Sequence, residues 1–242
     1  MIDIHSHLLY QVDDGPLALE ESLILLEQAE DNGVTDIILT PHSWAFAGEK
    51  NHEWLKERFI EFQTQAKQSK IQLHLGMEHA VDNYRRFVRQ IDKEGTLTLA
   101  ESRYILVEAM NLESTEDAEE LVYELRLRGF VPILAHPERM TCVGKDSKLV
   151  RAFRNSGGLV QLTLDACDPM ATGTFHKVAT RLLKEDEVDF IATDTHGLIR
   201  NCKALAEIKG RLEAYIGKEE TNRLIIENPM KVLQNEAIKK RR

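Results

Sequence analysis

The chain has 242 residues, 43% of them hydrophobic, and a formal net charge of −9 with an isoelectric point near 5.5. This hydrophobic fraction is enough for the core of one large domain, and we expect residues 1–242 to form a single domain. The acidic balance argues against a nucleic-acid partner and against electrostatic docking on anionic lipid. No apolar run approaches the roughly 20 residues needed to span a bilayer, so no stable membrane insertion is expected.

The cysteines and the N-terminus indicate the compartment. Cys142, Cys167 and Cys202 are an odd, scattered set without a C-x-x-C motif, which suits free thiols in a reducing compartment. Asp3 and His5 stand where a signal peptide would need a basic start and an apolar stretch. We therefore expect a cytoplasmic protein.

Strand-like and helix-like segments alternate along the whole chain. Ile2 and Ile4 alternate with polar neighbours, as in a short strand that leads into His5 and His7. Apolar residues at helical spacing then fill 18–32, and Gly33 is a suitable stop. After this strand and helix, the sequence predicts in chain order a strand over 34–40, a helix over 49–69, a strand over 71–76, a helix over 84–91, a strand over 104–107, a helix over 118–128, a strand over 131–135, a helix over 148–155, a strand over 159–164, a helix over 175–184, a strand over 190–193, and helices over 202–216 and 219–226.

This alternation predicts an α/β fold. Strands that alternate with helices form parallel βαβ units. About seven such units, without a linker or repeat between them, favour a TIM-like barrel of about seven parallel strands with surrounding helices, one strand short of the usual eight. A doubly wound open sheet is the alternative, although the chain has neither a G-x-G-x-x-G nor a G-x-x-x-x-G-K-[ST] motif for a nucleotide.

Potential metal ligands follow six of the seven predicted strands. The C-terminal ends of parallel strands meet at one rim of a barrel, where active sites lie. Any one of these residues alone would more often be a hydrogen-bonded histidine or a solvated carboxylate. Taken together they favour a metal cluster, because such groups are costly at apolar strand ends unless they are partnered. The set is His5, His7, His42, Glu78, Glu108, His136, Asp194 and His196.

The other four histidines are expected to be ordinary. They are His52, His74, His79 and His176. His79 adjoins Glu78, but the alternation of side chains along a strand predicts that it points away from the cluster.

Six short motifs resemble one known superfamily. They are the opening H-x-H at His5 to His7, D-D-G at Asp13 to Gly15, T-P-H at Thr40 to His42, G-x-E at Gly76 to Glu78, A-H-P-E-R at Ala135 to Arg139, and D-x-H at Asp194 to His196. Jointly they resemble the PHP (polymerase and histidinol phosphatase) superfamily. Within it, the N-terminal stretch is similar to the bacterial manganese-dependent protein-tyrosine phosphatases of capsule and exopolysaccharide operons, and the resemblance extends to Pro229.

The resemblance implies a PHP-type distorted barrel, a single metallophosphatase domain, with three metal ions. By this resemblance the first metal is held by His5, His7, Glu78 and Asp194, the second by Glu78, Glu108 and His136, and the third by Asp14, His42 and His196. Asp14 matches the third-metal position better than its neighbour Asp13. Manganese is the metal that the family implies, although a nitrogen and oxygen donor set without thiolates also suits iron or zinc.

The resemblance also implies a reaction. A metal-bridging hydroxide would attack the phosphorus of a phosphotyrosine in line, since clustered metals lower the pKa of water and hold phosphate oxygens. His42 is expected to serve in catalysis as well as in metal binding. Arg139 matches a family arginine that grips phosphate or the substrate ring, and Arg200 is a second candidate. The implied substrate is a phosphotyrosine protein, namely a bacterial tyrosine kinase that controls capsule or exopolysaccharide synthesis.

Other phosphatase chemistries are weaker hypotheses. None of the three cysteines begins a C-x5-R motif, and there is no G-x-S-x-G elbow. A small-molecule phosphatase such as a histidinol-phosphate phosphatase is the alternative, disfavoured by the short chain and the D-D-G element. An amidohydrolase is disfavoured because that class usually has a metal-bridging lysine, whereas the third strand here supplies a glutamate. A non-catalytic metal-binding scaffold is disfavoured because no expected ligand is missing.

Some loops depart from the family pattern. His79 follows Glu78 where relatives more often carry aliphatic or aromatic residues, and Arg200 lacks the proline that usually follows it. These loops should shape the substrate pocket, so the substrate is less well defined by sequence than the metal site. The basic tail from Lys239 to Arg242 is expected to be solvated.

Overall fold

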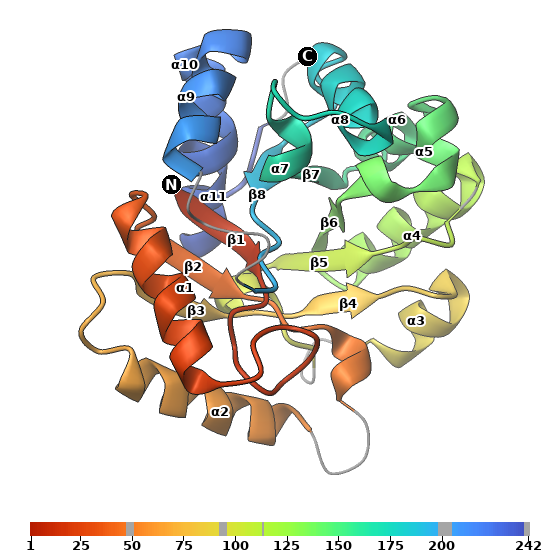
Figure 1. Ribbon diagram of the computed structural model, residues 1–242. Helices are drawn as coiled ribbons and strands as arrows, with labels where there is room; N and C mark the ends of the chain where they lie inside the picture. The colour runs from red at the N-terminus through yellow and green to blue at the C-terminus, as the bar shows by residue number, and fades with distance from the viewer. Residues whose placement is uncertain (47–50, 92–95, 113, 198–204, 240–242) are drawn as a thin grey trace.

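The computed structural model describes residues 1–46, 51–91, 96–112, 114–197 and 205–239. In this part of the chain, eight parallel strands lie at the centre and helices surround them (Figure 1). The strands are β1 (Ile2–Ser6), β2 (Asp36–Leu39), β3 (Gln72–Leu75), β4 (Glu78–Ala80), β5 (Tyr104–Glu108), β6 (Val131–Ala135), β7 (Leu159–Thr163) and β8 (Phe190–Ala192). The α/β class with parallel strands is therefore confirmed.

The strands form two sheets, so the predicted barrel of about seven strands is not what the structure has. One sheet has the order β1-β2-β3 and the other the order β4-β5-β6-β7-β8, and every pairing is parallel. Isolated bridges join the sheets at two seams, Ser6 with Thr195 and His42 with Glu78. The first seam lies at the C-terminal end of β1 and beyond that of β8, and the second joins the segment after β2 to the start of β4; predicted ligands lie at both.

The extra strand is β4, which follows directly after the predicted strand over 71–76 and pairs in the other sheet. Residues 72–75 pair with β2, and the chain then continues through Gly76 into β4, which pairs with β5. A Cβ at Gly76 would lie 2.9 Å from the Leu99 side chain and 3.0 Å from that of Ile38, so a larger residue at the crossing would require these side chains to shift. Glu78 is therefore the first residue of a strand rather than a residue in the loop after one.

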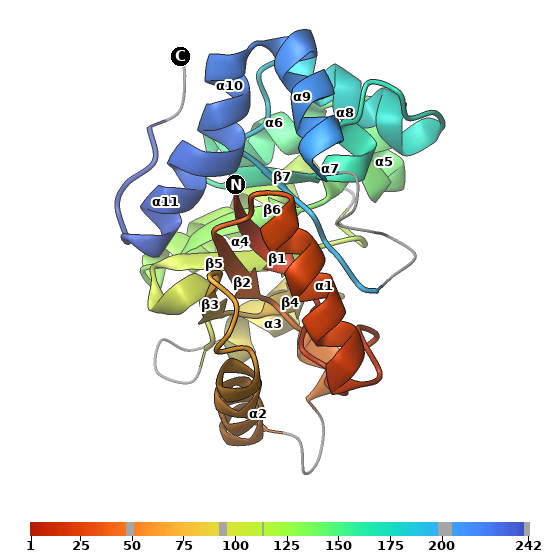
Figure 2. The ribbon, with the colours of Figure 1, turned by 60° about the vertical axis from the view of Figure 1, so that its left-hand side comes forward.

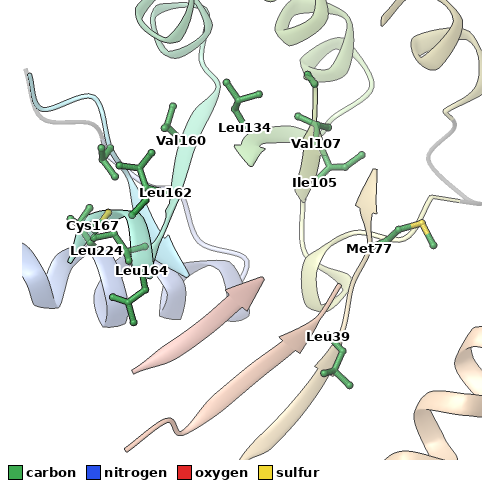
Figure 3. Close-up of a cluster of buried hydrophobic side chains, with 14 of the residues drawn as sticks. Leu39, Met77, Ile105, Val107, Leu134, Val160, Leu162, Leu164, Cys167 and Leu224 are labelled. Atoms are coloured by element: carbon green, nitrogen blue, oxygen red, sulfur yellow. The ribbon is translucent and has the colours of Figure 1, made fainter. Parts of the chain in front are cut away.

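Alternate residues of the strands form two hydrophobic clusters. The outer cluster packs between the strands and the helices, and Figure 3 shows Ile105, Val107, Leu134, Val160 and Leu162 among its members. The inner cluster takes the residues of opposite parity from β1, β2, β5, β6, β7 and β8. The inner faces of the strands are thus filled with apolar side chains up to the level of the rim.

The helices agree with the predicted segments and add three short ones. They are α1 (Leu19–Asp31), α2 (His52–Gln65), α3 (Tyr84–Gln90), α4 (Thr115–Leu127), α5 (Thr141–Lys145), α6 (Lys148–Asn155), α7 (Leu164–Cys167), α8 (Thr174–Lys184), α9 (Leu205–Ile216), α10 (Lys218–Asn222) and α11 (Asn228–Leu233). Asn51, Asn83 and Ser114 cap α2, α3 and α4 by accepting a hydrogen bond from a backbone N–H in the first turn.

The C-terminal helices cover the strands that open and close the fold. A π-helical segment, Arg223–Glu227, joins α10 to α11, and Leu224 and Ile225 belong to the outer cluster. Helix α11 lies beside β1, and Figure 2 shows α9 and α10 above them. Among the described residues, no helix combines the length and the apolar character that crossing a membrane requires.

Candidate metal centre

All nine predicted ligands converge at one rim of the strands, where Glu78 begins β4 and the other eight lie at or beyond the C-terminal ends of strands. They fall into four overlapping groups whose ligand atoms lie within 4.8 Å of one another. The groups are His7, Asp14, His42 and His196; His5, Glu78 and His136; His5, His7 and Asp194; and His42, Glu78 and Glu108. The sequence-based prediction of the cluster's membership agrees with this geometry, while metal binding itself stays a prediction.

An irregularity in β1 aims its two histidines at the centre. The register of β1 against β2 shifts between Asp3 and Ser6, the mark of a β-bulge, which re-aims the side chains that follow it. Ile2 and Ile4 belong to the inner cluster, yet His5 and His7 also face inward, and their Nε2 atoms are 3.1 Å apart. Two ring nitrogens this close suit two ligands of one cation.

Glu78 and Asp194 supply the buried negative charge. Glu78 Oε2 lies 3.4 Å from both His5 Nε2 and His7 Nε2 and 2.7 Å from His42 Nδ1. Asp194 Oδ1 lies 3.2 Å from His5 Nε2 and 3.4 Å from His7 Nε2. Neither oxygen has a hydrogen-bond partner of ordinary geometry among the described residues, although both are buried. A buried polar atom is costly without a partner, so these oxygens fit a cation that the protein alone does not provide.

The outer side of the cluster is more open. The side chain of Asp14 is 55% exposed, and its Oδ1 lies 3.3 Å from His196 Nε2 and 3.6 Å from His42 Nε2. Glu108 Oε1 lies 3.9 Å from His136 Nε2, and Glu108 Oε2 lies 4.0 Å from His42 Nδ1. Solvent and substrate can reach this side, whereas His5 and Glu78 are fully enclosed.

The charges of the cluster shift the pKa values of its members in opposite directions. Burial alone would raise the pKa of Glu78, but His5, His136 and His42 outweigh it and hold that pKa well below its ordinary value. Burial likewise opposes a charge on His7, but Asp13, Asp194 and Glu78 raise its pKa well above the ordinary value. The site therefore strongly favours positive charge at its centre.

Two residues outside the predicted set hold the histidine rings. His5 Nδ1 lies 2.9 Å from Gln161 Oε1 on β7, and His7 Nδ1 lies 2.7 Å from Asp13 Oδ2. Such partners fix the tautomer that leaves Nε2 free for a metal. The sequence contained a signal for Gln161, because it stands at an inward position of the one predicted strand without a ligand.

His136 and Asp194 adopt backbone conformations that are unusual for their residue types. Their φ angles are 31° and 54°, in the left-handed region. Non-glycine residues in this region cost about 1–3 kcal/mol and cluster at functional sites. Beyond His136, a short 3-10 turn (Pro137–Arg139) brings Arg139 back to the centre, where its guanidinium pairs with Asp194 Oδ2.

The centre opens into a cleft of about 880 Å³. The cleft is lined by Asp14, Gly15, Leu17, Glu21, His42, Glu108, His136, Arg139, Asp194, His196 and Gly197. The indole of Trp44 stacks on His42 with ring centroids 5.0 Å apart and is 54% exposed. Arg200, the second predicted arginine, lies outside the described residues.

The four histidines that were expected to be ordinary stay outside the ligand groups. His79 points away from the centre, as expected, and its Nε2 donates to the Leu97 carbonyl at 2.8 Å. Burial lowers its pKa to about 4, so this imidazole is neutral. His74, on β3, pairs with Asp36 on β2 at 3.3 Å and belongs to none of the ligand groups.

Histidines and carboxylates clustered at the ends of parallel strands define the class of metal-dependent hydrolase centres built on α/β folds. The chain matches the family described as capsular polysaccharide synthesis, CpsB/CapC, over residues 1–234, and it belongs to that family.

Relatives match nearly the whole chain. CapC of Staphylococcus aureus is 30% identical over 242 residues, covering 99% of this chain and 94% of CapC. The tyrosine-protein phosphatase CpsB of Streptococcus agalactiae is 29% identical over 245 residues, covering 98% and 100%. A solved structure from work on YwqE of Bacillus subtilis and CpsB of Streptococcus pneumoniae, described as unique metal-dependent tyrosine phosphatases, superposes with a TM-score of 0.88 at 26% identity, covering 100% of this chain and 97% of the other.

Proposed function

We propose that this protein is a metal-dependent protein-tyrosine phosphatase. The observation that carries the proposal is the convergence of nine histidine and carboxylate side chains around two buried oxygens, Glu78 Oε2 and Asp194 Oδ1, that have no hydrogen-bond partner of ordinary geometry among the described residues. The relatives named tyrosine-protein phosphatase, which match over almost the full length, support phosphotyrosine as the substrate.

The residues fit a cluster of three divalent ions, and manganese is our proposed metal. We assign the first position to His5, His7, Glu78 and Asp194, the second to Glu78, Glu108 and His136, and the third to Asp14, His42 and His196. The donor set is nitrogen and oxygen only, which suits manganese, iron or zinc. Bound ions would supply positive charge for the phosphate oxygens and would lower the pKa of water.

Side chains in the cleft and beside it are placed to bind the substrate. Arg139 is placed to donate to a phosphate oxygen, because its guanidinium is partly exposed in the cleft and, among the described residues, only its Nη2 has a hydrogen-bond partner. The exposed face of Trp44, beside His42, suits the phenyl ring of a phosphotyrosine. A role in binding or catalysis for Arg200 and a catalytic role for His42 remain part of the proposal.

The physiological substrate that we propose is a bacterial tyrosine kinase of capsule or exopolysaccharide synthesis. The family description places the chain in capsular polysaccharide synthesis, which supports a partner from that process. We further propose a cytoplasmic location, which the free cysteines Cys142 and Cys167 favour.

Turnover of three substrates by the same preparation tests the proposal. A phosphotyrosine peptide should be hydrolysed much faster than a phosphoserine peptide or histidinol phosphate. EDTA should abolish the activity, and Mn²⁺ should restore it. Preference for histidinol phosphate would refute the substrate, and activity that survives EDTA would refute the metal mechanism.

A further inference from the structure

The Asp13 carboxylate joins three parts of the candidate metal centre. Its Oδ2 accepts from His7 Nδ1 at 2.7 Å and from the His42 backbone N–H at 2.9 Å. Its Oδ1 accepts from the Gly15 backbone N–H at 3.1 Å. The side chain is fully buried, so water does not compete for these bonds.

Each bond controls a different ligand. The bond from His7 fixes the ring tautomer and leaves Nε2 free to face the centre. The bond from His42 fixes the backbone at the residue that carries another ligand. The bond from Gly15 closes the turn that presents Asp14, and a Cβ at Gly15 would lie 2.1 Å from the His7 carbonyl oxygen. The turn is thus packed directly against the His7 backbone.

His7, Asp14 and His42 are the residues that Asp13 orients, and all three belong to one ligand group, completed by His196. Asp13 itself is in none of the four groups found among the described residues. The second proposed position, of Glu78, Glu108 and His136, contains none of the three residues that Asp13 orients, and Gln161 rather than Asp13 holds the neighbouring His5.

We infer that Asp13 is a positioning residue that sets the metal affinity of the first and third proposed positions, to which His7, Asp14 and His42 contribute, and leaves the second, of Glu78, Glu108 and His136, nearly unchanged. The inference rests on the proposed metal centre. It assigns distinct tasks to two adjacent aspartates: Asp14 is a ligand, and Asp13 holds three ligands in place.

The test is a titration of metal-free protein with Mn²⁺, followed by calorimetry, for the wild type, Asp13→Asn, Asp13→Ala and Asp36→Asn. An asparagine has one acceptor oxygen and cannot serve all three donors, so Asp13→Asn should weaken one class of sites, those that include His7, Asp14 or His42, about 10-fold. Asp13→Ala should weaken the same class by up to about 100-fold. Asp36→Asn is the matched control, because Asp36 pairs with His74 outside the centre, and it should bind as the wild type does.

Binding indistinguishable from wild type in both Asp13 variants would overturn the inference, as would an equal loss at every site. Circular dichroism of each variant establishes that it is folded, and Asp13→Asn, which conserves shape, decides the matter if Asp13→Ala does not fold. Absence of Mn²⁺ binding by the wild type would instead refute the proposed function.

Discussion

Glu78 is the residue around which the candidate centre is arranged. Its two oxygens lie close to four imidazoles, from His5, His7, His42 and His136. It is fully buried at the start of β4 and has no cationic Lys or Arg partner among the described ion pairs. Such an anion is stable only with positive charge nearby, supplied either by protonated imidazoles or by metal ions.

At the residue scale, the sequence predicted the ligands better than their supports. The nine ligands could be predicted because eight of them stand at or after the end of a predicted strand, and the ninth, Asp14, lies in the D-D-G motif that resembles the family. Asp13 could not be assigned its role, since adjacent aspartates look alike in a sequence and the bonds to His7 and His42 join segments far apart in the chain. Arg139 was predicted to grip phosphate, but the sequence contains no signal for its pairing with Asp194.

Two histidine variants compare the centre with a control. His42→Ala removes a ligand from two groups and exposes Glu78. Loss of a residue that only supports a metal ligand lowers activity by up to about 100-fold, so loss of a ligand should lower phosphotyrosine turnover by at least about 100-fold. His74→Ala removes a carboxylate–histidine pair outside the centre and should leave turnover within about two-fold. Steady-state rates with saturating Mn²⁺ measure both, and equal losses would contradict the assignment of His42.

At the element scale, most helices and strands could be predicted from the sequence, but their exact boundaries and the shortest elements could not. The strand over 131–135 agrees with β6 in both bounds, because it is an uninterrupted apolar run between clear stops. β4, α5 and α7 have three to five residues, too few for a periodic pattern to show. α11 begins at Asn228-Pro229, where proline is accepted in a first turn although it reads as a stop in the sequence.

Helix α6 is anchored by a buried arginine. Arg154 donates to both oxygens of Asp189 at 3.0 and 3.1 Å and to Glu187 at 2.9 Å, and Asp189 is completely buried. Arg154→Met should therefore lower the free energy of unfolding by about 3–5 kcal/mol, because it leaves a buried carboxylate without its cation. Arg151→Met, a change to a half-exposed arginine of the same helix, should have little effect. Urea denaturation measures both; similar values for the two variants would contradict this account.

Helix α9 is tied to the loop after α7 by Arg211 and Asp168. Arg211 donates to both Asp168 oxygens, at 2.8 and 2.7 Å, and lowers the pKa of that carboxyl below its ordinary value of 3.8. A lowered carboxyl pKa contributes stability above pH 3.8 that is lost as the pH falls through the lowered value. The difference in melting temperature between wild type and Arg211→Ala should thus be largest near neutral pH and shrink below about pH 4. A difference that is independent of pH would show that the pair contributes through packing alone.

At the scale of the whole molecule, the charge balance explains why metal ions matter for substrate as well as for chemistry. The chain carries a net charge of −9, and four carboxylates stand among the nine ligands. A phosphate dianion would be repelled from such a site unless cations reversed the local field. The parallel α/β architecture was predictable from alternating segments, whereas the division into two sheets depends on how one segment pairs at Gly76, which periodicity does not encode.

Metal binding should stabilise the entire fold. Ions that bind only the folded protein at about 100 times their dissociation constant add about 2.7 kcal/mol. For a chain of this length that corresponds to a rise of roughly 5–10 °C in melting temperature. Calorimetric scans with Mn²⁺ and with EDTA measure the effect, and identical melting temperatures would argue against occupied sites in the folded protein.

The most direct test of the central claim is phosphotyrosine turnover as a function of Mn²⁺ equivalents added to metal-free protein. A multinuclear centre predicts no turnover without metal and a rate that keeps rising beyond one equivalent per chain, towards a plateau near three. Full activity without metal, or a rate that is already maximal at one equivalent, would contradict it.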